Sequence, residues 1–374
     1  MNPHTPSKTI TDQRTRHKSR GWHALLAIPL LLAGLLLAAS PAPAQPNLGR
    51  PASGCVRHDL PVTLTGSPTS TRYRLAGWLC LPRRHTSTVQ LLVPGLTYTH
   101  RYWTGPGNGA DYVTTALAAG DAVYLIDRIG TGASDRPPAD QVTTTTEAAV
   151  THQAVHALRD GMIGRFPHVV GIGHSFGSVI WMAEAANNHD VDALVLTGLL
   201  HDINPEALSL FTHDLHPAAD EPKFGRLALP AGYLTTRPGS RAGYFLDPST
   251  AVSGAAVWDE KTKTTATTGE LTFTPDDELR YSRAITAPVL LVVGAADALF
   301  CGPGQPCQQP ADICQRERYA YATEVNLSAA TVADTGHSIN LHRSAPRAFN
   351  LIQRWLDRGG RAPGDIAAVT SCHP

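Results

Sequence analysis

The chain has no excess of charge of either sign. Its 31 lysine and arginine residues are balanced by 31 aspartate and glutamate residues, and charged residues make up only 17% of the 374. The chain therefore lacks the basic stripe that binds nucleic acid and the long acidic tract that acts as a solvating tail, and we expect no nucleic-acid partner. A hydrophobic content of 42% instead predicts a globular protein with a substantial core.

Motifs for cofactors and metals are also missing. No metal, nucleotide or flavin motif is present, and the stretch Gly302-Pro303-Gly304 does not match G-x-G-x-x-G. The cysteines include no C-x-x-C pair and lie in Gly/Pro-rich loops, which argues against a zinc site. We therefore expect no cofactor and no bound metal, and the chain has no internal repeats.

One apolar run stands near the N-terminus, from Ala24 to Ala39, between a basic stretch and the small-residue segment 40–45. This order is typical of a secretory signal peptide with an A-x-A-like cleavage site, so we expect residues 1–44 to be removed and the protein to be secreted, without stable membrane insertion. The basic stretch has no twin arginine, which favours general secretion. The alternative is a permanent anchor, because the run is near the lower length limit of a membrane span.

All six cysteines follow this segment. An even number in an exported chain predicts up to three disulfides. We expect Cys55 to pair with Cys80 and so to tie the first two strands together. The other four should pair among themselves and fix the loop after Asp297 and the C-terminal tail; they are Cys301, Cys307, Cys314 and Cys372.

Short apolar runs alternate with helix-like segments along most of the chain. Strands are expected at 56–65, 73–81, 89–93, 122–126, 168–172, 193–196, 289–293 and 329–333, and helices at 112–119, 147–163, 176–187 and 345–356. Thr145 or Thr146 is the expected N-cap of the second helix. This alternation predicts an α/β fold with a mostly parallel central sheet and helices on both faces.

The alternation breaks between residues 201 and 285, where Pro, Thr, Gly and Asp are frequent and aromatic residues are scattered. The segment is too long to be a loop of a compact domain. We therefore predict a core of residues 45–200 and 286–374, with residues 201–285 inserted as a cap over the site. The alternative is a partly disordered insertion, above all at 259–269. We expect a monomer that acts on a small-molecule substrate.

A G-x-S-x-G motif stands between a predicted strand and a predicted helix, as Gly173-His174-Ser175-Phe176-Gly177. In such a nucleophile elbow the serine lies on a sharp strand-to-helix turn, and the glycines leave room for that turn. The first N–H groups of the next helix then point at a developing negative charge. This pattern predicts that Ser175 is a nucleophile.

A serine nucleophile needs a base, and the base needs an acid to orient it. Asp297 follows the predicted strand 289–293, and His337 follows the last predicted strand. Both positions are at the carboxyl ends of strands, where open α/β sheets place their sites. We predict that Ser175, Asp297 and His337 form a catalytic triad.

Three further residues near these positions must be considered for the roles of acid and base. Asp202 follows the strand 193–196 and could supply the acid instead. His342 stands close to His337 in the sequence, and Asp334 is expected to be structural.

Two backbone N–H groups are expected to form an oxyanion hole. One belongs to Phe176, the residue after the nucleophile, and the other to Leu96, in the turn after the strand 89–93. Each well-placed donor contributes on the order of 10²–10³ in rate.

Taken together, these motifs resemble the α/β-hydrolase superfamily. The run from Asp127 to Ser134 resembles the superfamily's D-x-x-G-x-G-x-S loop, and the match spans about residues 89–356. Residues 233–239 resemble, more weakly, cap segments of exported members. One departure is Pro94-Gly95, where many members have His-Gly. The backbone donor should survive this change, but the support of a histidine side chain is lost.

The resemblance implies a hydrolase, and the serine at position 175 argues against the relatives that use aspartate there, which are epoxide hydrolases and dehalogenases. We expect a secreted serine hydrolase that cleaves carboxylic esters of a mostly apolar substrate. An aminopeptidase of the proline iminopeptidase type is an alternative, and it would need a cap carboxylate to hold the substrate amine. The candidates for that carboxylate are Asp220, Glu221, Asp259 and Glu260. Further alternatives are a non-hydrolytic lyase or cyclase and a binding protein that has lost catalysis.

Overall fold

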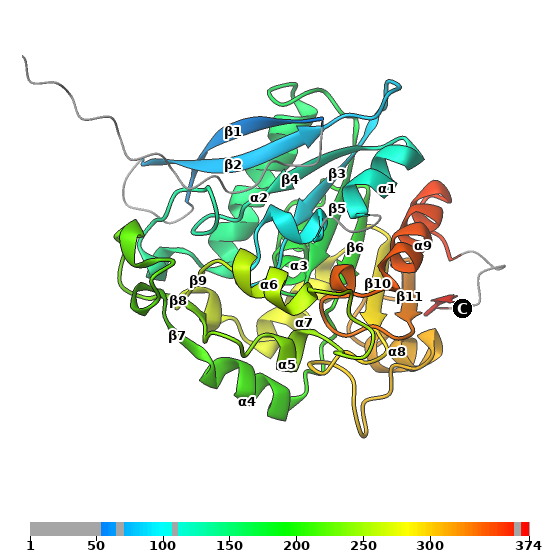
Figure 1. The fold of residues 1–374 in the computed structure, drawn as a ribbon. Helices are drawn as coiled ribbons and strands as arrows, with labels where there is room; N and C mark the ends of the chain where they lie inside the picture. The colour runs from blue at the N-terminus through cyan, green and yellow to red at the C-terminus, as the bar shows by residue number, and fades with distance from the viewer. Residues whose placement is uncertain (1–53, 65–70, 107–110, 363–367, 374) are drawn as a thin grey trace, which may run out of the picture. The chain divides into compact units, whose positions relative to one another are not determined.

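The computed structural model describes residues 54–64, 71–106, 111–362 and 368–373, which Figure 1 draws in colour. The predicted signal peptide, residues 1–44, lies outside the described residues. Within these ranges, no helix is long and apolar enough to cross a membrane.

A nine-stranded sheet forms the centre of the fold, in the order β1-β2-β4-β3-β5-β6-β10-β11-β12. Its strands are β1 (Cys55–Thr63), β2 (Arg72–Cys80), β3 (Thr88–Val93), β4 (Ala122–Ile126), β5 (His168–His174), β6 (Ala193–Thr197), β10 (Val289–Gly294), β11 (Leu327–Val332) and β12 (Val369–Ser371). The strands from β4 to β11 in this order are parallel, whereas β1, β2 and β12 pair antiparallel with their neighbours. The predicted mostly parallel sheet is confirmed.

Three of the parallel strands are almost entirely apolar because both faces of the sheet are covered. Every residue of β4, β6 and β10 is buried. A strand that is covered on both faces reads as a continuous apolar run rather than an alternating one. This is why these strands were visible in the sequence.

Two groups of helices cover the sheet. Helices α1 (Tyr112–Ala119) and α9 (Ala345–Asp357) pack against each other, and α3 (Phe176–Asn188) packs against both α2 (Thr144–Arg159) and α7 (Pro275–Ala284) (Figure 1). The sequence did not predict α8 (Pro310–Glu317) or the short edge strand β12. Helical turns of the 3-10 type lie at His100–Trp103, Ala139–Gln141, Ala218–Asp220, Gly225–Leu227, Glu270–Thr272 and Ile339–Leu341.

Helix α2 begins earlier than predicted, so the expectation of Thr145 or Thr146 as its N-cap was wrong. Thr143 is the N-cap, and its hydroxyl accepts the N–H of Thr146 at 3.3 Å. The Thr146 hydroxyl accepts the N–H of Thr143 at 2.8 Å in return. This reciprocal capping box satisfies two free amides at once, and it therefore fixes the helix start before Thr144.

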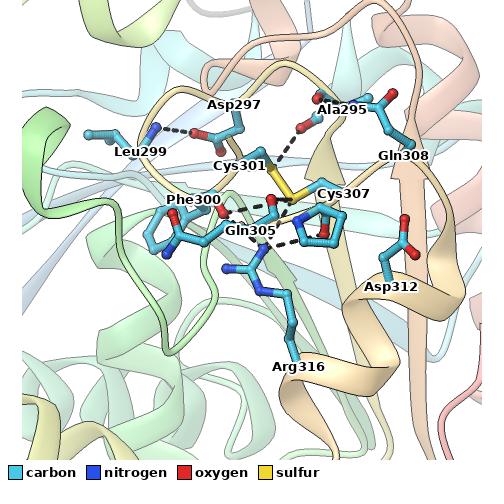
Figure 2. Close-up of a disulfide and its surroundings, with 12 residues drawn as sticks. Ala295, Asp297, Leu299, Phe300, Cys301, Gln305, Cys307, Gln308, Asp312 and Arg316 are labelled. Atoms are coloured by element: carbon cyan, nitrogen blue, oxygen red, sulfur yellow. Dashed lines mark hydrogen bonds between the residues drawn. A yellow bond between two sulfur atoms is a disulfide. The ribbon is translucent and has the colours of Figure 1, made fainter. Parts of the chain in front are cut away.

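The disulfide pairing is confirmed. Cys55 and Cys80 are bonded and lie opposite each other in the β1–β2 register. Cys301 bonds Cys307 in the loop that follows Asp297, as Figure 2 shows. Cys314 of α8 bonds Cys372, which anchors the C-terminal segment to the core.

Residues 201–285, called the insertion below, form a folded segment. It contains α4 (Pro205–His213), α5 (Ala242–Phe245), α6 (Ala255–Thr262) and α7, and a three-stranded sheet of β7 (Leu215–Pro217), β8 (Tyr233–Thr236) and β9 (Ala266–Thr267). Asp259 and Thr265 in the stretch 259–269 are fully buried, so this part of the insertion packs against other residues of the chain. The boundaries of the insertion, and its role as a cap, stay predictions. The last helix of the insertion, α7, packs on α3 of the core.

Candidate active site

Ser175 lies at the sharp turn between β5 and α3. Its φ of 53° and ψ of −122° put a non-glycine residue in a sparsely populated backbone region. Its N–H donates to the carbonyl oxygen of Thr197 at 2.8 Å, which ties the turn to β6. The residue is partly exposed. Backbone strain held in place by neighbouring strands is typical of functional sites.

Two glycines show how closely the neighbouring segments approach this turn. A Cβ atom on Gly177 would lie 2.2 Å from the carbonyl oxygen of Val93, so α3 starts directly against the end of β3. A Cβ atom on Gly95 would lie 3.0 Å from the Cβ atom of Ser175. The turn after β3, which carries Leu96, therefore contacts the serine.

Asp297 and His337 come together across two strand ends. The His337 Nδ1 atom lies 2.9 Å from Oδ2 of Asp297, and both residues are buried. The other oxygen of Asp297 accepts the N–H of Leu299 at 2.9 Å. Since a carboxylate only accepts, Nδ1 carries the proton and Nε2 is left as an acceptor.

The Nε2 atom of His337 is buried and has no hydrogen-bond partner among the described residues, Ser175 included. A buried polar atom without a partner calls for an explanation. Hydrogen bonds between a catalytic base and its nucleophile are often long in ligand-free structures and tighten when substrate binds. Nε2 is thus available to accept a proton.

The competing residues have other partners. The backbone oxygen of Asp202 accepts from Gln305 and Arg316, and the contact with His337 is made by Asp297 instead. His342 accepts the N–H groups of Gly336 and Asp247 through Nε2, at 3.1 and 3.0 Å. It therefore shapes the loop that holds His337.

His174 is a site residue that sequence reasoning missed. Its ring centroid lies 4.9 Å from that of His337, and it stacks on Tyr102 at 4.2 Å. Burial, and secondarily the charge of His337, lower the pKa of His174 well below its usual value. A neutral His174 does not repel the positive charge that His337 acquires when it takes a proton. Its place inside G-x-S-x-G was the only signal in the sequence.

Aromatic side chains surround His337. Phe245 stacks on its ring at 5.4 Å, and Phe300 lies at 5.9 Å. Tyr98 lies 5.6 Å from Phe245 and bonds the Ser338 hydroxyl at 2.7 Å. Phe245 belongs to α5, so the insertion supplies part of this apolar wall.

The turn that carries Leu96 is strained and is held by the insertion. Tyr98 N–H donates to Gly95 O at 3.2 Å, and Thr97 between them has a φ of 60°, which is unusual for a β-branched residue. The Thr97 hydroxyl accepts from Arg241 at 2.6 Å, and the Thr97 carbonyl accepts from Thr264 N–H at 2.8 Å.

The N–H groups of Leu96 and Phe176 are both free to bind an anion. Neither has an acceptor in the part of the chain that the structure describes. The close approach of Gly95 to Ser175 brings the turn of Leu96 beside the start of α3, where Phe176 lies. An oxyanion hole needs two such donors beside the nucleophile, and this pair stays the predicted one.

Arg128 lies behind both donor residues. Its Nη2 donates to Gly95 O at 3.3 Å, and its guanidinium lies 5.5 Å from the Phe176 ring centroid. Its Nη1 binds both oxygens of Glu147, at 2.7 and 2.8 Å, and also contacts Glu270 of the insertion. Burial, opposed by Arg128 and reinforced by Glu270, raises the pKa of Glu147 to about 8.

Most of the acidic residues considered for amine binding are already paired with cations. Arg241 binds Asp259 through two hydrogen bonds, at 2.7 and 3.0 Å. Lys263 binds Glu221 at 2.8 Å and Glu260 at 2.6 Å. The fourth candidate, Asp220, is exposed.

Comparisons with known proteins agree with the fold. The model of the alpha/beta hydrolase family matches residues 90–350. No curated protein matches the chain in sequence.

Solved structures resemble the chain at low sequence identity. A monoacylglycerol lipase from Paleococcus ferrophilus is 16% identical, with a TM-score of 0.53 over 77% of this chain and 100% of that one. An enol-lactonase from Burkholderia xenovorans is 15% identical, with a TM-score of 0.51 over 80% and 99%. A lipase in its open form is 16% identical, with a TM-score of 0.54 over 82% and 99%. At these identities the likeness concerns the fold.

Proposed function

Because the chain belongs to the alpha/beta hydrolase family, we propose that it is a secreted serine hydrolase that cleaves carboxylic esters of a mostly apolar substrate. The observation that carries the proposal is the 2.9 Å contact between Asp297 and His337, which leaves Nε2 of His337 without a partner. His337 also lies next to His174, which directly precedes Ser175.

In this mechanism the Ser175 hydroxyl attacks the ester carbonyl carbon while Nε2 of His337 takes its proton. Asp297 keeps the ring oriented through Nδ1 and stabilises the imidazolium. The N–H groups of Leu96 and Phe176 bind the oxyanion, which collapses to an acyl-enzyme as His337 protonates the departing alcohol. Water, deprotonated by His337, then attacks the acyl carbon and releases the acid and the free Ser175 hydroxyl.

Two observations support an apolar ester over an amine-bearing peptide. The rings of Phe245 and Phe300 lie beside His337, where an acyl or alkyl chain would be shielded from water. Three of the four acidic residues that could bind a substrate amine are instead neutralised by Arg241 or Lys263.

Secretion is supported by the signal-peptide pattern in residues 1–44 together with the three disulfides. Disulfides persist in oxidising compartments and are rare in the cytosol.

The decisive experiment combines a fluorophosphonate probe with a chain-length series of p-nitrophenyl esters. We expect the probe to label the wild type at Ser175 and to leave Ser175→Ala unlabelled, and we expect Ser175→Ala to abolish ester turnover. Ester hydrolysis should exceed hydrolysis of aminoacyl amides. Undiminished turnover by Ser175→Ala would refute the proposed triad.

A further inference from the structure

A cluster of two histidines and two carboxylates lies at the packed pair α2 and α3, away from the site described above. His152 and His156 are four residues apart on α2, so they lie on one face of that helix. Asp190 is the second residue after the end of α3, and Glu184 lies within that helix. Figure 1 shows that α2 and α3 belong to the same region of the fold.

The polar atoms of this cluster converge. The Nδ1 atom of His152 lies 2.9 Å from Oδ2 of Asp190 and 3.3 Å from Oε1 of Glu184. The Nε2 atom of His156 lies 4.0 Å from the same oxygen of Asp190. One ligand atom from each of His152, His156 and Asp190 falls within 4.8 Å of the others.

Three of the four carboxylate oxygens in this cluster have no partner in hydrogen-bond geometry among the described residues. The fourth, Oε1 of Glu184, lies 3.3 Å from both His152 Nδ1 and Asn188 Nδ2. Neither oxygen of Asp190, although shielded from solvent, has a partner in hydrogen-bond geometry among the described residues. Glu184 is fully buried, and its Oε2 also lacks a partner in this part of the chain. Buried carboxylates are normally paired with cations or bound to metals, because an uncompensated buried charge is costly.

We propose that His152, His156 and Asp190 form a binding site for a divalent transition-metal ion such as Zn²⁺. Two imidazoles and one carboxylate are ligands that zinc prefers, and water would take the fourth position of a tetrahedral site. The neighbouring carboxyl group of Glu184 would add negative charge beside the ion. Ligand atoms around a tetrahedral zinc ion with bonds of about 2.1 Å are about 3.4 Å apart. Oδ2 of Asp190 lies 2.9 Å from Nδ1 of His152 and 4.0 Å from Nε2 of His156, and these two distances straddle that value.

The imidazoles exclude the hard ions Mg²⁺ and Ca²⁺, which prefer oxygen ligands only. The ion would replace the proton on Nδ1 of His152 and join α2 to the end of α3. His156 is half exposed, with 54% of its side chain accessible, so it is free to turn toward the ion. Since α3 is 13 residues long, the ion would be roughly 20 Å from Ser175, and its role would be structural rather than catalytic.

The test uses the tag-free protein after treatment with EDTA. We expect calorimetric titration with ZnCl₂ to show one site and the Tm to rise with zinc. Co²⁺ should give the visible absorption of a tetrahedral complex. The variants His156→Ala and Asp190→Asn, each at a partly exposed position, should bind Zn²⁺ at least about tenfold more weakly while remaining folded.

His213→Ala is the matched control. His213 is an exposed histidine that also has a carboxylate neighbour, with Nδ1 lying 3.4 Å from Asp214. This variant should keep the affinity and the zinc-dependent Tm of the wild type. Absence of zinc binding by the wild type, or equal affinity in His156→Ala and the wild type, would overturn the proposal.

Discussion

Arg128 donates a hydrogen bond to the carbonyl oxygen of Gly95, which belongs to the same peptide group as the N–H of Leu96. A donor on the oxygen fixes the plane of that peptide and polarises it, so that the N–H on its other side becomes a stronger donor. Arg128 thus orients the proposed oxyanion hole without touching the substrate.

Arg128→Lys should therefore lower kcat more than it raises KM. Lysine keeps the positive charge beside Glu147 and Glu270. Its single ammonium group, unlike the planar guanidinium of arginine, cannot bind these two carboxylates and Gly95 O at the same time. Misplacing one of two oxyanion donors should cost about 10–10² in kcat, somewhat less than complete loss of a donor. Steady-state kinetics with a p-nitrophenyl ester would measure this split.

Arg136→Lys serves as the control for that variant, because Arg136 stands in the same loop and binds backbone oxygens of Gly132 and Ser134. It should leave kcat within about twofold. Unchanged kcat in Arg128→Lys, with the fold intact, would show that Arg128 is only structural.

Asp297→Asn should reduce kcat by a factor on the order of 10³–10⁴ while binding of substrate changes little. Asparagine keeps the shape of the side chain, but its amide does not stabilise the His337 imidazolium. Asp202→Asn is the matched control, since Asp202 was the alternative acid, and it should retain wild-type kinetics. A larger loss of kcat in Asp202→Asn than in Asp297→Asn would show that Asp202, not Asp297, is the acid that orients His337.

Glu147 should make the free energy of unfolding depend on pH. Its pKa is raised to about 8, so the folded state holds a proton that the unfolded state, with a pKa near 4.5, releases. The stability that this proton confers is complete below about pH 4.5 and is lost as pH rises toward 8. Urea unfolding across this interval should show a weaker decline for Glu147→Gln than for the wild type. The exposed Glu206→Gln should behave as the wild type, and an identical decline in Glu147→Gln would contradict the assignment.

The buried pair Arg241–Asp259 should show strong coupling. Removing one partner leaves a buried unpaired charge, so Arg241→Met or Asp259→Leu should each lower the free energy of unfolding by about 3–5 kcal/mol. The double variant should lose much less than the sum of the two. Chemical unfolding in a double-mutant cycle measures this difference, and additive losses would argue against the pairing.

The sequence predicted those parts of the fold and site that depend on local sterics. The apolar runs of β4, β6 and β10 were visible because both faces are covered, and the elbow was visible because a tight turn needs its glycines. The contact between Asp297 and His337 was predictable because each residue follows the carboxyl end of a strand in the same parallel sheet.

Long-range pairings were not predictable. Arg128 stands in a recognisable loop, but its contact with Glu270 spans 142 positions, and the bond from Arg241 to Thr97 spans 144. Nothing local marks such partners, because tertiary packing alone brings them together. The zinc-site proposal has the same origin, since Asp190 reaches the two histidines only through the packing of α3 on α2.

The strained turn at Thr97 bears on how far this chain can vary. Arg241 and Thr264 bond Thr97 directly, and Glu270 contacts Arg128, which bonds Gly95 O in the same turn. The insertion is therefore not an interchangeable module that could be swapped to alter substrate preference. Any replacement must reproduce the contacts of Arg241, Thr264 and Glu270. The residues between these three positions are the ones that can vary.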